Sequence, residues 1–241
     1  MENHQLTKRE RRELLQQEKM QKEDQTKKSR KIKKRIKIIS IIIAVIGIGM
    51  IFWFTSNKTT VPTNELLTVV SDDWAKGNKD APVTIIEYLD FECEACGSYY
   101  PLVKRLSQEY GDKVSFVTRY FPLPGHRNSM TSALAVESAG KQGKYWEMYD
   151  TVFENQSLWG EKETPEPTIF EGYAQQLGLD MEKFRQDINS QEVKDRIERD
   201  KNTGNKLGIE GTPTFFLNGK RIENPRGYEE FKKILDNALK N

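Results

Sequence analysis

The stretch that decides the fold is Phe91–Gly97, F-E-C-E-A-C-G, which directly follows the apolar run Val83–Leu89. It holds Cys93 and Cys96, the only two cysteines among 241 residues. This spacing is typical of a redox-active dithiol or of half of a zinc site. A zinc site needs about four nitrogen or sulfur ligands, and the chain adds only two histidines. A structural disulfide would close a very short loop and stabilise the fold little. The pair therefore indicates redox chemistry, with no metal and no cofactor.

The amino-terminal part of the chain combines a basic tail with an apolar run. Residues 1–37 hold 14 Lys or Arg against 6 Asp or Glu, whereas the remaining residues hold 24 against 30. Ile38–Phe54 follows without a charged side chain and ends in three aromatic residues. At about 1.5 Å per residue, this run can cross the hydrocarbon core of a bilayer. Because the basic cluster Lys31–Lys37 directly precedes it, the positive-inside rule keeps residues 1–37 in the cytoplasm. We expect a transmembrane helix at 38–54 and everything after it outside the cytoplasm.

A cleaved signal peptide is the main alternative for this segment. The basic region is longer than such a leader carries, and no A-x-A-like cleavage site follows in Thr55–Lys58. We therefore favour an uncleaved, single-pass anchor in the cell membrane. The tail could also bind nucleic acid, but its place beside the span favours anionic lipid. Outside the cytoplasm, disulfides form and persist, so the dithiol is expected to act on exported proteins with free thiols.

The remaining sequence predicts an α/β domain at 65–241, reached through a polar linker at 55–64. We expect strands at 65–70, 83–89, 114–121, 211–217 and 220–222. We expect helices at 96–110, 129–141, 144–155, 168–177, 181–189, 191–207 and 228–239, and a surface loop at 157–167. The second and third strands, with the helix between them, form a right-handed βαβ unit with parallel strands. Pro101 lies inside that helix and should kink it.

The helix after the dithiol predicts how the two thiols differ. Cys93 falls at its N-terminus and Cys96 one turn further in. Unpaired backbone N–H groups and the helix macrodipole favour an anion at this end, which lowers the pKa of a thiol placed there. We therefore expect Cys93 to be the attacking thiolate, and the more shielded Cys96 to resolve the mixed disulfide.

Glu87 is the unusual residue of the strand before the dithiol. Because side chains alternate along a strand, it shares a face with Val83, Ile85 and Leu89. Burial among hydrophobic residues raises the pKa of a carboxyl group, and a buried acid just before a dithiol could carry its protons. The alternatives are that this face is exposed or that Glu87 meets a cation.

The whole order of elements resembles the thioredoxin fold with a helical insertion, here at about 126–207. Over about residues 66–240 the chain is similar to the DsbA-like thiol:disulfide oxidoreductases of bacterial envelopes. Cys93 and Cys96 match the active-site pair of that family, and Glu87 matches its buried carboxylate. Thr212-Pro213 matches the residue and the cis-proline that face the active-site disulfide. Further matches are Pro101 as the kink proline, and Phe121-Pro122-Leu123, His126 and the helix start after Gly143 as parts of the insertion.

The resemblance implies an enzyme that introduces disulfides into exported proteins and is re-oxidised by a membrane redox partner or an external oxidant. It also implies that backbone groups of Thr212 are left free to pair with an extended substrate chain. A disulfide reductase or isomerase with the same site, and a non-catalytic binding or chaperone domain, are the alternatives. His126 is either part of this site or a capping or packing residue near a helix start.

The dipeptide between the cysteines, Glu94-Ala95, departs from the family because it lacks the His or Pro often found there. A carboxylate beside the thiolate opposes the stabilisation at the helix N-terminus, which is ~0.3–1 kcal/mol. We therefore predict a couple less oxidising than relatives with histidine at this position. Glu94→Gln should make the potential more oxidising, where ~30 mV corresponds to ~1.4 kcal/mol. Equilibration with glutathione measures the shift, and a potential that stays unchanged would contradict the prediction.

Overall fold

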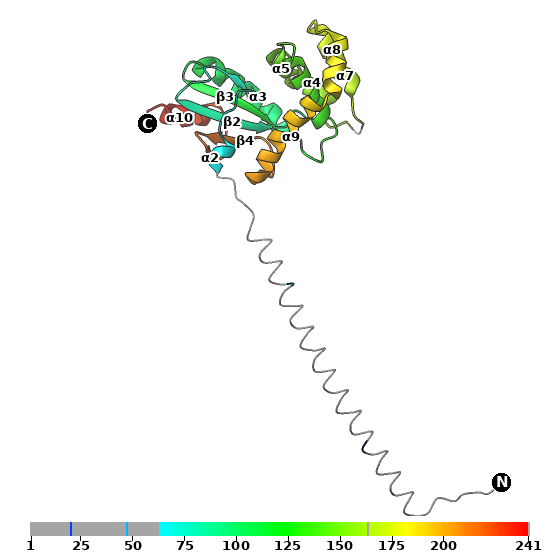
Figure 1. Cartoon of the computed structure of the whole chain (residues 1–241). Coiled ribbons are helices and arrows are strands. Elements are labelled where there is room, and N and C mark those ends of the chain that lie inside the picture. The colour runs from blue at the N-terminus through cyan, green and yellow to red at the C-terminus, as the bar shows by residue number, and fades with distance from the viewer. Residues whose placement is uncertain (1–19, 21–46, 48–62, 163, 241) are drawn as a thin grey trace, which may run out of the picture. The chain divides into compact units, whose positions relative to one another are not determined.

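The protein is described by a computed structural model that covers residues 20, 47, 63–162 and 164–240 (Figure 1). The chain divides into two compact units, residues 1–60 and 61–241, and nearly all described residues belong to the second. The predicted tail at 1–37, the predicted span at 38–54 and most of the linker lie outside the described residues. Among those that are described, no helix combines the length and the apolar composition needed to cross a bilayer.

One mixed sheet of five strands, in the order β1-β3-β2-β4-β5, lies at the centre of the described part of the chain (Figure 1). The strands are β1 Trp74–Lys76, β2 Val83–Leu89, β3 Val114–Tyr120, β4 Thr214–Leu217 and β5 Lys220–Arg221. Strands β2 and β3 are parallel, and all other pairs are antiparallel. The helix α3 Glu94–Tyr110 connects β2 to β3, which confirms the predicted βαβ unit. Pro101 lies inside α3, as predicted.

The predicted strand at 65–70 is wrong. Residues Thr63–Leu66 form the short helix α2, and the strand that pairs with β3 is β1. The reason is a buried arginine: the two terminal nitrogens of Arg119 donate to the carbonyl oxygens of Leu66 and Thr68, both at 2.7 Å. These carbonyls are therefore occupied by a side chain and are not available to a β-ladder.

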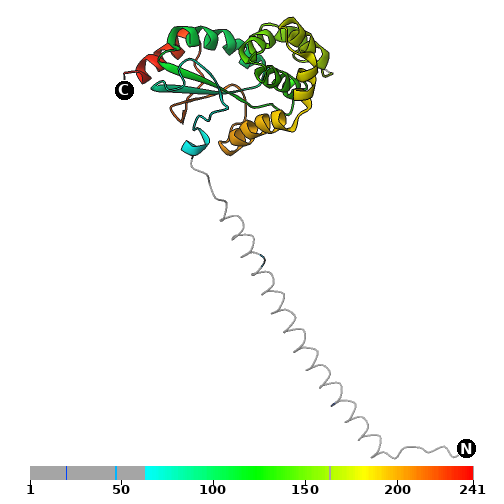
Figure 2. The same cartoon turned by 45° about the horizontal axis from the view of Figure 1, so that its top comes forward.

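The two faces of the sheet are covered by different helices, as Figure 2 shows. Helices α3 and α10 Tyr228–Ala238 pack on one face, where Val83 and Ile85 of β2 are buried. Helix α2, helix α9 Gln191–Lys206 and the chain after α9 cover the other face, where Ile86 and Tyr88 are buried. Strand β2 is thus enclosed on both sides, because it lies in the middle of the sheet.

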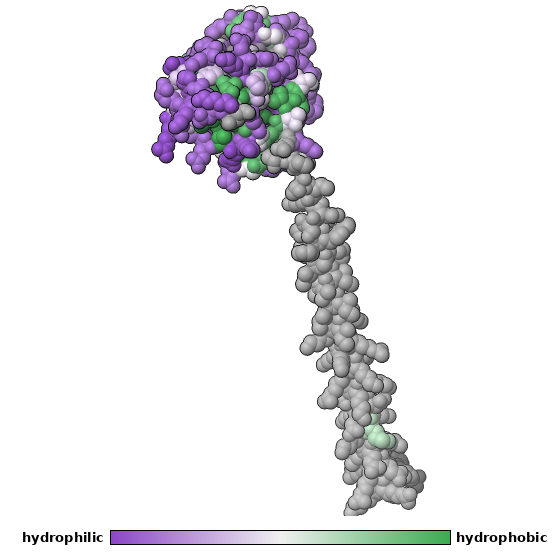
Figure 3. Space-filling view, turned by 90° about the vertical axis from the view of Figure 1, so that its left-hand side faces the viewer, coloured by the Kyte–Doolittle hydropathy of each residue, from purple (hydrophilic) through white to green (hydrophobic). Residues whose placement is uncertain are grey.

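The chain between β3 and β4 forms the predicted helical insertion at one end of the sheet (Figure 1). Its helices are α4 Ser129–Gly140, α5 Tyr145–Glu154, α6 Gln156–Trp159, α7 Pro167–Gln176, α8 Met181–Asn189 and α9 Gln191–Lys206. All but α6 lie within one residue of their predicted bounds. Helix α6 falls where we predicted a loop, because Trp159 is fully buried and its Nε1 donates to the carbonyl oxygen of Val152 at 3.2 Å. The face drawn in Figure 3 is mostly hydrophilic, with hydrophobic residues in a limited central area.

Candidate active site

The dithiol lies at the start of α3, directly after the carboxyl end of β2. Cys93 is the N-cap residue, with an extended backbone (φ −68°, ψ 120°), and its carbonyl oxygen accepts the N–H of Gly97 at 3.0 Å. The helix therefore begins at Glu94, two residues before the predicted start. Both cysteines are free thiols; Cys93 is 9% exposed, whereas Cys96 is fully enclosed.

The surroundings of Cys93 favour its thiolate. The thiol of Cys96, which hydrogen-bonds the Cys93 sulfur, is the largest influence in lowering the pKa of Cys93 from 9.0 to about 5. Partial burial opposes this shift, while the backbone N–H groups of Cys96 and Ala95 add to it. These N–H groups are the free donors of the first helical turn, so the position of Cys93 as N-cap adds to the larger effect of the Cys96 thiol.

Cys96 has the opposite behaviour. Burial raises its pKa well above the ordinary value, and the neighbouring Cys93 sulfur and the carboxyl group of Glu87 raise it further. At neutral pH the pair therefore consists of one thiolate near the surface and one enclosed thiol. This asymmetry is what thiol–disulfide exchange requires, because the thiolate is the nucleophile.

The cis peptide bond expected before Pro213 is confirmed. This segment faces the dithiol, since Cys93 Sγ lies 3.3 Å from the carbonyl oxygen of Thr212. The hydroxyl group of Thr212 is buried and has no hydrogen-bond partner among the described residues, and the carbonyl oxygen of Pro213 accepts from Asn224 Nδ2 at 2.8 Å. A groove of ≈ 620 Å³ runs along this segment and is lined by Gly211, Thr212, Pro213, Thr214, Arg221, Ile222, Glu223 and Asn224.

Glu87 is buried, as its strand position suggested, and neither alternative holds. It is 4% exposed, its register neighbours are Thr118 of β3 and Phe215 of β4, and its carboxyl group makes no hydrogen bond or ion pair with any described residue. Burial alone raises its pKa from 4.5 to about 8. The carboxyl group is therefore protonated at neutral pH and close enough to Cys96 to influence its pKa.

Asp90 and His126 form a second polar pair beside the dithiol. The side chain of Asp90 accepts the backbone N–H groups of Glu92 and Leu123, both at 2.9 Å, and its Oδ2 lies 2.7 Å from His126 Nδ1. Burial is the largest single influence and lowers the pKa of His126. The hydrogen bond to Asp90 and the negative charges of Asp90, Cys93 and Glu92 together outweigh it, and the net shift is upward. His126 lies in the loop before α4 and pairs with Asp90. It does not cap that helix, whose N-cap residue is Asn128.

Two side chains that the sequence did not single out hold the turn in front of the helix. Glu92 is buried and accepts the backbone N–H groups of Asn128 and Glu161. Gln156, the first residue of α6, donates to the carbonyl oxygens of Phe91 and Cys93. No local pattern marks either residue, because both act on parts of the chain more than thirty positions away.

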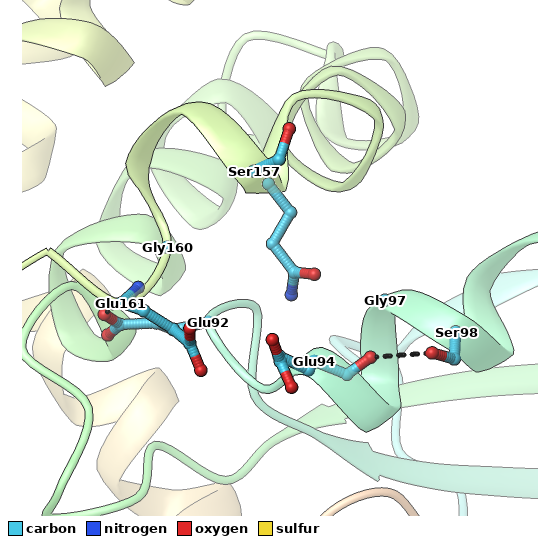
Figure 4. Close-up of a pocket in the computed structure, with 8 residues that line it drawn as sticks. Glu92, Glu94, Gly97, Ser98, Ser157, Gly160 and Glu161 are labelled. Atoms are coloured by element: carbon cyan, nitrogen blue, oxygen red, sulfur yellow. Dashed lines mark hydrogen bonds between the residues drawn. The ribbon is translucent and has the colours of Figure 1, made fainter.

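A cavity of ≈ 530 Å³ lies beside this turn (Figure 4). It is lined by Glu92, Glu94, Gly97, Ser98, Gln156, Ser157, Gly160 and Glu161. Ser98 Oγ donates to the carbonyl oxygen of Glu94 at 3.0 Å, and the side chain of Glu94 is exposed. Neither cysteine lines this cavity. Among the described residues, no three His, Cys, Asp or Glu side chains come together in a group that could hold a metal ion.

A thioredoxin-like sheet, an asymmetric dithiol at a helix N-terminus and a cis-proline facing it define a thiol:disulfide oxidoreductase. Comparison with known proteins agrees. The thioredoxin family matches residues 70–237. The probable disulfide bond formation protein D of Bacillus cereus is 32% identical over 209 residues, which are 84% of this chain and 95% of that protein. The chain belongs to the thioredoxin family and, within it, to the DsbA-like oxidoreductases with a C-x-x-C active site.

Solved structures show the same fold. Wolbachia pipientis alpha-DsbA1 is 26% identical with a TM-score of 0.68, covering 75% of this chain and 96% of its own. Oxidised BdbD of Bacillus subtilis is 26% identical with a TM-score of 0.60, covering 69% of this chain and 92% of its own.

The Na(+)/H(+) antiporter NhaA 3 of Salinispora tropica is 36% identical over 168 residues, which are 69% of this chain. The chain spans only 25% of that antiporter's length, so the similarity is to one part of it.

Proposed function

We propose that this protein is a membrane-anchored oxidase that introduces disulfides into exported proteins through Cys93 and Cys96. The observation that carries the direction of the reaction is the lowered pKa of Cys93, about 5, beside a Cys96 whose pKa is raised by burial. Such surroundings stabilise the reduced form, and a stabilised reduced form makes a couple oxidising. The name of the Bacillus cereus relative, a probable disulfide bond formation protein, supports the same direction.

The reaction begins with the Cys93–Cys96 disulfide. A substrate thiolate attacks the more accessible sulfur, that of Cys93, and the S–S bond breaks with its electron pair going to Cys96, which then takes up a proton. A second substrate thiolate attacks the substrate sulfur of the mixed disulfide, and Cys93 leaves as a thiolate. The substrate has lost two electrons and the enzyme has gained them. A thiolate of low pKa leaves faster, which fits the surroundings of Cys93.

Three further residues have proposed roles in this cycle. Glu87, protonated at neutral pH and close to Cys96, supplies the proton that Cys96 needs and takes it back on re-oxidation. Thr212 and Pro213 lie beside Cys93 and guide the substrate chain along the adjoining groove. A membrane redox partner or an external oxidant regenerates the disulfide.

The location is part of the proposal. Residues 38–54 anchor the protein in the cell membrane, residues 1–37 stay in the cytoplasm, and the domain at 65–241 works on the outer side. The support is the uncharged apolar run with its basic flank. A dithiol that oxidises other proteins needs a compartment in which disulfides persist, and the outer side of the membrane provides it.

Cys96→Ser is expected to trap substrates. In this variant the Cys93 thiolate can still attack a disulfide of a substrate, whose second sulfur leaves as a thiolate. No Cys96 thiol is then present to break the mixed disulfide, so adducts should accumulate in cells and disappear when extracts are reduced. The measurement is non-reducing electrophoresis of the full chain, followed by identification of the partners. They should be exported proteins that contain cysteine.

The matched control is the double variant Cys93→Ser, Cys96→Ser, which has no thiol and should trap nothing. Mixed disulfides made mainly with cytoplasmic proteins would overturn the location, and no adducts at all would overturn Cys93 as the exchanging thiol.

A further inference from the structure

Gln156 joins the helical insertion to the turn that carries the attacking thiol. Its side-chain nitrogen donates to the carbonyl oxygen of Phe91 at 2.7 Å and to that of Cys93 at 2.9 Å. A side-chain amide has two donor hydrogens, and both are therefore used on the turn. The cycle proposed above gives Gln156 no role.

Gly97 makes room for this amide. A Cβ atom built at Gly97 would lie 2.2 Å from Gln156 Oε1, well inside van der Waals contact. The amide thus rests directly on the backbone of the first turn of α3, and any larger residue at 97 would push it away. The fit involves two segments that are far apart in sequence, one from the dithiol motif and one from the insertion.

The contact bears on the thiolate in two ways. The carbonyl oxygen of Cys93 carries partial negative charge on the residue that holds the anion, and the amide hydrogens offset part of that charge. The same carbonyl oxygen also accepts the N–H of Gly97, so Gln156 holds Cys93 in the N-cap conformation, which places its sulfur at the positive end of the helix macrodipole. Both effects stabilise the charged form, and a low-dielectric setting strengthens them.

We infer that Gln156 is a positioning residue that sets the acidity of Cys93, and through it the oxidising power of the dithiol. The insertion then has a part in the chemistry: its helix α6 carries the group that fixes the N-cap. The inference rests on Cys93 being the attacking thiol, as proposed above.

The test is the pH dependence of Cys93 alkylation in the reduced full chain, purified in detergent. Cys96 is enclosed, so the rate reports on Cys93. Gln156→Met keeps the length of the side chain and removes both donors. It should raise the midpoint of the alkylation profile by at least about 0.5 pH unit, roughly a threefold change in acidity. The glutathione equilibrium should become less oxidising by a similar factor.

Gln142→Met is the matched control. Gln142 also lies in the insertion and makes two hydrogen bonds, to the backbone carbonyl and N–H groups of Asp180 at 3.1 and 2.9 Å. It touches neither cysteine among the described contacts. A residue that only supports the fold would lower the melting temperature without moving the midpoint, so Gln142→Met should leave the midpoint where it is.

Gly97→Ala approaches the same contact from the other side and serves if Gln156→Met fails to fold. It should displace the amide and move the midpoint in the same direction, and the double variant should add little to either change. Gln156→Glu, equal in size but unable to donate, should move the midpoint at least as far. A midpoint that stays within about 0.1 unit in the folded variants, or a control that shifts as much, would overturn the inference. A slow, high-pH alkylation profile in the unchanged chain would instead overturn the role of Cys93.

Discussion

Replacing Glu87 with glutamine is expected to stabilise the reduced protein by about 3 kcal/mol at pH 7, with a gain that grows as the pH rises. Burial raises the pKa of Glu87 from 4.5 to about 8 in the folded protein. Between these two values the folded state keeps a proton that the unfolded state has lost. The free energy of unfolding therefore falls with rising pH, by up to about 1.4 kcal/mol per unit.

The measurement is urea denaturation of both proteins from pH 5 to pH 8 under reducing conditions. Cys93 contributes a slope of the opposite sign, because its pKa is lowered on folding, but that slope is common to both proteins. The difference between the two curves therefore isolates Glu87: it should be small at pH 5 and largest near pH 8. Glu182→Gln, the same change at an exposed site, should alter stability by less than about 0.5 kcal/mol.

The same variant separates stability from chemistry. If Glu87 carries the proton of Cys96, the more stable Glu87→Gln protein should exchange disulfides more slowly, because general acid–base groups typically contribute 10²–10⁴-fold. A stopped-flow measurement with a reduced peptide gives the rate. A variant that is neither more stable at pH 8 nor slower in exchange would contradict both the ionisation argument and the proposed proton transfer.

The dithiol could be found from the sequence because the residues that determine its chemistry are close together in the chain. Cys93 and Cys96 are three positions apart, a strand precedes them and a helix follows. The Cys96 thiol and the helix N-terminus, both local to Cys93, lower its pKa. The order of elements, through its resemblance to a known fold, also brought Pro213 to the site from more than a hundred residues away. Glu87 could be predicted only in part. The alternation of side chains along a strand shows which face of the sheet it lies on, but not which elements cover that face.

What the sequence could not show depends on distant side chains that replace local hydrogen bonds. Residues 65–70 have the composition of a strand, yet Arg119 of β3 takes two of the carbonyls that a ladder would use. Helix α6 forms because Trp159 is drawn into the core of the insertion. Gln156 then falls on the dithiol turn, and nothing around it in the sequence predicts that.

Arg119→Met is the other change with a large expected effect, a loss of about 3–5 kcal/mol of stability. The side chain of Asp73 is fully buried, and Arg119 donates to its two oxygens at 3.3 and 2.8 Å. Removing the guanidinium group leaves this carboxylate with longer contacts to Arg196, 3.4 Å, and Arg199, 3.6 Å, and with the backbone N–H of Val70. It also strips the carbonyl oxygens of Leu66 and Thr68 of a donor. The costly part is the buried carboxylate that has lost its shortest ion pair. A loss of this size is large, because domains are stable by only about 5–15 kcal/mol in total.

A double-mutant cycle separates two possible causes of this loss of stability, the buried charge of Asp73 and the lost packing of the Arg119 side chain. Asp73→Asn removes the charge that Arg119 neutralises, so the double variant Arg119→Met, Asp73→Asn should be destabilised by clearly less than the sum of the two single changes. Methionine keeps much of the apolar stem of arginine, so a purely additive result would assign the loss to packing and to the two carbonyls. Urea denaturation under reducing conditions gives the free energy of unfolding of the unchanged protein, the two single variants and the double variant. The alkylation midpoint of Cys93 should be the same in all four proteins, because no described contact joins Arg119 or Asp73 to the dithiol. A shift of that midpoint would mean that this buried ion pair also supports the active site.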